Sequence, residues 1–281
     1  LPRFASAPVR QTATAGMGST EWIAERLLPD DKARDAFHAQ VADIYRPRLQ
    51  QLGMAPKAGE PDDDGLLRAS LVGFFAETLK DPAVRAQMNQ AGRAVLGLDG
   101  DGRLHLDAVP QDLRDTALAV AVQEGGKAAF DAAEKQFRAS QDAVLRSQLL
   151  GAMGGTQDAV LNERARALVF EPGLLRRNEI FPVVGGQAGD AATRPALRDW
   201  TDAHFKEIVA KLAPAGAAVI NLYSAGMCSD ADAAALQDKF ATRVEDIEGG
   251  PRQLKQTVEA IRMCAAQVEA RKGQPVAFPK R

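Results

Sequence analysis

Helix-length segments with apolar residues at helical spacing follow one another along nearly all of this 281-residue chain. One segment begins at Asp30 and Asp31 and ends at Gly53, and another spans 251–272. Both carry an apolar stripe and charges elsewhere, which is typical of a helix that docks on its neighbours by one face. No run of strand-like alternation stands out. The pattern therefore predicts an all-α fold.

Proline, glycine and aspartate separate these segments and mark where helices begin and end. Short helices joined by short loops pack beside their sequence neighbours, and pairs in series form a solenoid with one continuous core. Because no strict period is found, we expect a HEAT-like or armadillo-like superhelix of antiparallel helix pairs. We assign 1–8 to an unstructured lead-in tail and 9–281 to a single superhelical domain. Further helices are expected to begin near Asp62, Asp81, Pro110, Gly126, Ser140, Thr156, Leu174, Thr193, Pro214, Ser229 and Pro251.

Composition limits the partners of such a chain. Its 35 basic and 37 acidic residues nearly cancel, and no long basic run is present, so neither nucleic acid nor an anionic membrane surface is predicted as a partner. No apolar run approaches the roughly 20 residues that span a bilayer. The chain starts at Leu1 without a signal-peptide pattern, so we expect a segment of a longer protein. It is predicted to be soluble, in the cytoplasm or periplasm of a bacterium.

The residues that carry catalysis are missing. The three histidines, His38, His105 and His204, begin the sequences HAQVA, HLDAV and HFKEI, so no HExxH is available to hold zinc. No GxSxG elbow is present. Gly125-Gly126-Lys127 lacks the remaining residues of a phosphate-binding loop. We therefore predict no catalytic residue and no metal ligand in this chain.

Two glycine-rich segments are interpreted as turns. The segment 99–107 has the closely spaced carboxylates that calcium prefers. However, Arg103 and Leu104 stand where a calcium loop needs an oxygen ligand and a glycine, which favours a turn between helices. The segment 151–155 is read as a helix stop, with Thr156 as the next N-cap.

The two cysteines, Cys228 and Cys264, lack the close spacing of a zinc ribbon or redox motif. The sequence favours ordinary buried or half-buried thiols, with a disulfide as the alternative.

Arg176, Arg177 and Arg194 lie near predicted helix starts. Such arginines are most often solvated or paired with a carboxylate. The alternative is that they face a concave surface and bind a carboxylate in bidentate fashion, for which the guanidinium geometry is suited.

Several segments resemble, in order, the C-terminal helical domain of the aminopeptidase N family of zinc metallopeptidases. Residues 48–54 are similar to the family's L-x-x-LGW, and Val109-Pro-Gln-Asp-Leu-Arg114 to its IPxDLR. The remaining similarities are Leu67-Arg68 to LR, 79–82 to a GDP turn, 149–154 to LLxALG, 193–205 to GRxLAWDFLKxNW and 259–262 to ExIR. The resemblance extends from about Arg26 to near the end of the chain. Met54, Arg198 and Asp190 depart from the family pattern.

This resemblance implies a helical domain that caps the catalytic domain of a zinc aminopeptidase and encloses its peptide chamber. Zinc and the HExxH motif would then belong to the catalytic domain, which would be the partner of this chain together with peptide substrates. Arg176, Arg177 and Arg194 become candidates for holding a peptide's carboxylate end. Two other hypotheses remain: a free-standing helical-repeat scaffold that binds a protein partner, and an independent hydrolase.

Overall fold

The computed structural model describes residues 2–274. These residues form helices and turns and contain no β-strand, so the predicted all-α class is confirmed. They divide into two compact units, one of residues 2–133 with 272–274 and one of Glu134–Arg271. Within each unit, helices pack on their close neighbours in the sequence, which is the packing expected of a helical solenoid. The single domain predicted for 9–281 stays a prediction.

In the described part of the first unit, six α-helices, a π-helical segment and two 3₁₀ turns come before the long helix α7. Its elements are α1 (Pro2–Ala5), α2 (Arg10–Thr14), α3 (Gly18–Leu27), α4 (Asp31–Leu52), α5 (Asp62–Gly73), η1 (Phe74–Thr78), α6 (Pro82–Val95), η2 (Leu106–Ala108), η3 (Gln111–Leu113) and the first part of α7 (Arg114–Ala139). The unstructured lead-in predicted for 1–8 is wrong at Pro2–Ala5, because this segment forms α1 and buries Ala5.

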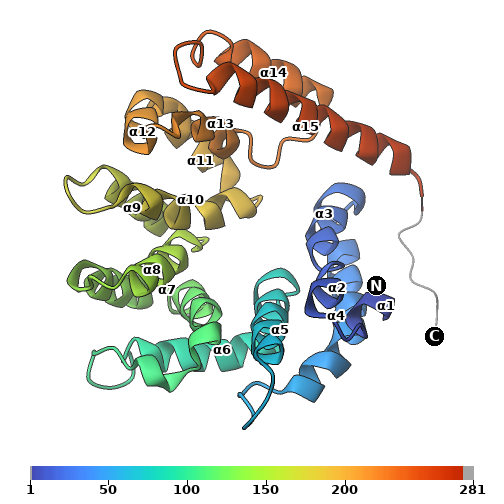
Figure 1. The fold of residues 1–281 in the computed structure, drawn as a ribbon, viewed down its shortest axis with the longest axis vertical. Helices are drawn as coiled ribbons and strands as arrows, with labels where there is room; N and C mark the ends of the chain where they lie inside the picture. Colours follow the sequence, from blue (N-terminus) through green and yellow to red (C-terminus); the bar gives the residue numbers. More distant parts are fainter. Residues whose placement is uncertain (1, 275–281) are drawn as a thin grey trace. The chain divides into compact units, whose positions relative to one another are not determined.

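The second unit begins in the last turns of α7. It contains α8 (Ala143–Gly154), α9 (Ala159–Ala167), η4 (Leu168–Phe170), η5 (Arg177–Glu179), α10 (Ile180–Gly189), α11 (Arg194–Ala203), α12 (Phe205–Leu212), η6 (Gly216–Ala218), α13 (Val219–Tyr223), α14 (Asp230–Phe240) and α15 (Gly250–Arg271). Helix α10 packs on α8 and α9, and α14 packs along α15 (Figure 1).

Side-chain caps explain many of the helix starts. Asp30 accepts a hydrogen bond from the Ala33 amide, and Asp81 accepts from the amides of Ala83 and Val84. Ser229 caps α14 in the same way. Such caps satisfy amides that a helix leaves without partners at its N-terminus. They act over three residues, and for this reason the sequence predicts them.

Several predicted helix starts differ from the structure. Asp142 caps α8 where a start near Ser140 was expected, and the helix expected near Leu174 is α10, which begins at Ile180 after the η5 turn.

The start predicted near Gly126 is confirmed, because α7 consists of two helices that meet at a kink where Gly126 has a non-helical φ of 54°. Glycine reaches this conformation without the steric cost other residues meet. Thr156 was predicted to cap the helix after 151–155, but Asp158 caps α9 by accepting from Val160 and Leu161. The segment 96–103 forms the predicted turn.

The two cysteines form a disulfide, Cys228–Cys264, with their Cα atoms 5.2 Å apart. The preference for ordinary thiols was therefore wrong. The physical reason is that α15 runs beside the segment that leads into α14, which brings two residues together that are remote in the sequence. Spacing alone could not show this proximity.

Candidate functional site

The three predicted arginines lie at opposite ends of α10. Arg176 and Arg177 stand just before α10 begins, whereas Arg194 follows its last residue, Gly189. A ten-residue helix is about 15 Å long. The structure therefore brings Arg176 and Arg177 together and does not bring Arg194 to them.

Each of these arginines has a different environment. Arg177 is exposed and has no hydrogen bond or ion pair to another residue in the described part of the chain. Arg176 is also exposed, and its guanidinium donates to the Gln141 carbonyl at 3.3 Å. Arg194 is buried, and it donates to the carbonyls of Ala188 and Gly189 at 2.7 and 2.8 Å. Arg194 thus caps the C-terminal end of α10, where helices leave carbonyls without partners.

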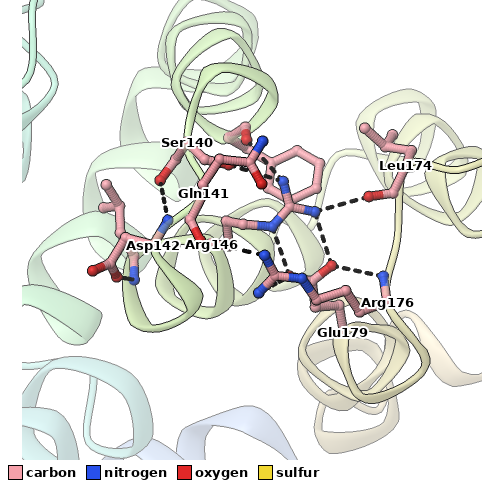
Figure 2. A network of polar contacts seen from close by, with 9 residues as sticks. Ser140, Gln141, Asp142, Arg146, Leu174, Arg176 and Glu179 are labelled. Atoms are coloured by element: carbon pink, nitrogen blue, oxygen red, sulfur yellow. Dashed lines mark hydrogen bonds and ion pairs between the residues drawn. The ribbon is translucent and has the colours of Figure 1, made fainter.

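Arg176 lies at the edge of a buried ion-pair network centred on Arg146 (Figure 2). Arg146 donates from Nε and Nη2 to the two carboxylate oxygens of Glu179, at 2.7 and 2.8 Å. Both side chains are almost fully buried, with 6% and 3% of their surface exposed. This bidentate contact is the strong form of a charge-assisted hydrogen bond.

The remaining donors and acceptors of this network are also used. Arg146 donates to the carbonyls of Ser140 and Leu174, and Glu179 accepts from the Arg176 amide at 2.8 Å. The Arg146 hydrogen bonds keep the pKa of Glu179 below its ordinary value of 4.5. The network joins the end of α7, the start of α8 and the turn before α10. We interpret it as a structural element of the second unit.

Arg166 is another buried arginine of the second unit, and its hydrogen-bond donors are only partly satisfied. It donates to the Gln187 side-chain oxygen at 2.7 Å. No carboxylate contacts it in the described residues, and its Nε has no hydrogen-bond partner there. Burial lowers its pKa, because loss of hydration disfavours the charged form.

The histidines lie on separate elements. His38 is on α4, His105 precedes η2 and pairs with Asp101 at 2.9 Å, and His204 follows α11. Among residues 2–274 there is no group of three or more His, Cys, Asp or Glu side chains that could hold a metal ion. Within the same residues no helix is long and apolar enough to cross a membrane.

Sequence reasoning missed a pocket in the first unit, beside the turn between η1 and α6. Its volume is about 430 Å³, within the range of small-molecule and peptide side-chain sites. The lining residues are Lys80, Pro82, Arg85, Ala86, Asn89 and Glu124. Pro82, Ala86 and Asn89 are spaced so that they share one face of α6, and Glu124 comes from α7.

The backbone beside this pocket is unusual. In η1, the Leu79 amide donates to the Phe74 carbonyl five residues back, at 2.9 Å. π-helical segments of this kind are rare and are frequent at functional sites. Lys80 follows with φ 53°, the only positive φ of a non-glycine residue in the described chain, and such a conformation is uncommon. The sequence indicated a turn at 79–82 but neither the π-helical segment nor the positive φ of Lys80.

Some polar side chains of the pocket have hydrogen-bond partners within the described chain, and others do not. Arg85 donates to the Ala76 carbonyl at 2.9 Å and, from Nε, to Glu124 Oε1 at 3.0 Å. Asn89 Oδ1 has no partner among the described residues. Nearby, Glu77 accepts from Thr116 at 3.2 Å. The residue reaches the surface, but the atoms packed around its carboxylate remove part of its hydration and raise its pKa above 4.5.

Comparison with known protein families identifies the chain at the level of the domain. Residues 11–263 match the family described as ERAP1-like C-terminal domain. The match covers most of the chain, which therefore belongs to this family of aminopeptidase C-terminal domains. The resemblance found in the sequence is confirmed. No curated protein matches the chain significantly.

Proposed function

We propose that this chain forms a wall or cap of the peptide-binding chamber of a zinc aminopeptidase, where it assists substrate access and positioning. The observation that carries the proposal is the family match over residues 11–263. Hydrolysis of the N-terminal residue by zinc-activated water would occur in a separate catalytic domain. The three histidines of this chain lie on different elements, His38 on α4, His105 before η2 and His204 after α11, which agrees with this division of labour.

The part played by this chain is mechanical and steric. A chamber wall must keep its shape while peptides enter and leave. The buried Arg146–Glu179 pair and the disulfide support such rigidity in the second unit. A rigid wall places the distal part of a peptide without ordering loops at each binding event, and this lowers the entropic cost of binding.

Arg176 and Arg177 remain candidates for holding a peptide's carboxylate end, because both guanidinium groups are exposed. Arg194 is a weaker candidate, since it would have to give up two hydrogen bonds to carbonyls of α10. Alanine at a true contact should weaken the assembled enzyme for peptides with a free carboxylate by about 1 to 3 kcal/mol. An equal effect on amidated peptides would show that these arginines do not bind the peptide carboxylate.

We also propose that the domain works in an oxidising compartment, which in a bacterium is the periplasm. The support is the Cys228–Cys264 bond, because disulfides persist outside the reducing cytosol. The proposal therefore favours the periplasm over the cytoplasm, the other compartment that the sequence allowed.

The gene upstream of Leu1 provides the first test. We expect it to encode HExxH followed by a further glutamate ligand. We also expect the isolated chain to show no turnover of aminoacyl-anilides with added zinc. A coding region without a zinc motif, or turnover that scales with the concentration of the isolated chain, would contradict the proposed function.

A further inference from the structure

The pocket beside Lys80 combines an open volume with hydrogen-bonding groups that no described residue satisfies. Asn89 Oδ1 is buried, and no described residue donates to it. An unpaired buried acceptor is unfavourable, and most buried polar groups in proteins have a partner. The Asn89 amide nitrogen likewise has no hydrogen bond within residues 2–274. The amide can therefore turn toward the pocket without breaking a contact.

Glu124 supplies a second acceptor at the opposite wall. Its Oε1 receives two donors from Arg85, whereas its Oε2 has no partner in the described chain. The Glu124 side chain is 45% exposed, so a ligand can reach it. The pocket thus offers one amide, which both donates and accepts, and one free carboxylate oxygen.

The charges around the pocket nearly balance. Lys80 and Arg85 are opposed by Glu124 and by Glu77, whose pKa both cations lower in part. A strongly charged ligand would gain little net attraction from such a site. A neutral ligand with alternating N–H and C=O groups matches the available donors and acceptors better.

We propose that this pocket binds an extended peptide segment through its backbone, with one peptide unit paired to Asn89 and a further N–H donated to Glu124 Oε2. An extended backbone presents unpaired N–H and C=O groups along its edge, and proteins use such groups for sequence-tolerant recognition. The choice of a peptide over another amide rests on the proposed function. Pro82 and Ala86, both exposed on the same face of α6, would contact the side chains of that segment.

Titration of the full chain by NMR tests this binding directly. The probe is an uncharged decapeptide, acetylated and amidated at its ends, and the signal is the Asn89 side-chain amide, assigned by its loss in Asn89→Leu. We expect this signal to shift and saturate, while the exposed Gln90 on the same helix does not respond. The same peptide with N-methylated backbone amides should bind about tenfold more weakly, because it lacks the donors.

A pair of variants tests the pocket without changing Asn89 itself. Ala86→Trp should fill the pocket and abolish the shift, whereas Ala83→Trp, exposed on α6 and outside the pocket, should leave it unchanged. Equal binding of the N-methylated peptide, equal effects of both tryptophans, or no shift of Asn89 at millimolar peptide would overturn the proposal. None of these results would change the zinc motif expected upstream, so failure here is distinct from failure of the proposed function.

Discussion

The polar cluster around Arg146 and the pocket beside Lys80 use similar residues in opposite ways. Around Arg146, the Glu179 carboxylate and the carbonyls of Ser140 and Leu174 satisfy a buried guanidinium. Beside Lys80, Asn89 and one oxygen of Glu124 lack partners in the described chain. The difference shows that charge alone does not identify a binding residue. An arginine whose N–H groups all donate to protein acceptors stabilises the fold. A side-chain amide without hydrogen-bond partners is available to a ligand.

The largest expected effect comes from breaking the satisfied cluster from one side. Arg146→Met removes the bidentate partner of the buried Glu179 and leaves only the more distant Arg176 guanidinium, 3.9 Å away. We expect a loss of about 3–5 kcal/mol in the free energy of unfolding. Urea unfolding measures this loss. Arg177→Met, which removes an exposed and unpaired guanidinium, should change stability by less than about 0.5 kcal/mol. Similar losses of stability in the two variants would contradict the assignment of Arg146, rather than Arg177, to the stabilising core of the second unit.

The disulfide should contribute the next largest effect. It closes a loop with a sequence separation of 36, and replacing both cysteines by serine should lower the stability of the second unit by about 2–4 kcal/mol. Reductant should destabilise the natural chain and leave the double variant unchanged. Two thiols that react with a labelling reagent before reduction would show that the bond does not form.

The smallest expected effect is on the pH dependence of stability, which should differ between the Arg146 cluster and the region of the Lys80 pocket. The pKa of Glu179 is lowered by Arg146, so its stabilising contribution is lost as the pH falls below 4.5 through the folded pKa. The pKa of Glu77 is raised by loss of hydration, so stability is lost as the pH rises above 4.5 through its folded pKa.

Glu77→Gln should therefore stabilise the chain more at pH 7 than at pH 4, because the glutamine cannot ionise. Unfolding free energies of the variant and the natural chain at both values measure this change. A difference that does not depend on pH would mean that Glu77 is normally hydrated.

Local features of the sequence could be predicted well. Helices were expected to begin near Asp81 and Ser229, and these two residues cap α6 and α14. Such starts are local, because a cap depends on residues two or three positions away. The helical class follows from apolar spacing, which each segment carries by itself. The family resemblance succeeded for a related reason, since it rested on the order of many short motifs.

Features that need residues from different elements could not be predicted. The Cys228–Cys264 bond depends on how α15 runs past the start of α14. The pocket needs Glu124 of α7 beside residues of α6 and the turn after the π-helical segment η1, and this segment has no sequence signature. Arg194 is a surface candidate by sequence, yet it turns back onto the end of α10.

The proposed function holds that this domain places peptides for a separate catalytic domain. Its most direct test is the kcat/KM of the zinc catalytic domain with and without this chain, for a decapeptide and for an aminoacyl-anilide. The chain should raise kcat/KM for the decapeptide at least about tenfold, equivalent to about 1.4 kcal/mol, and leave the anilide almost unchanged. An equal effect on both substrates, or none on either, would contradict the claim.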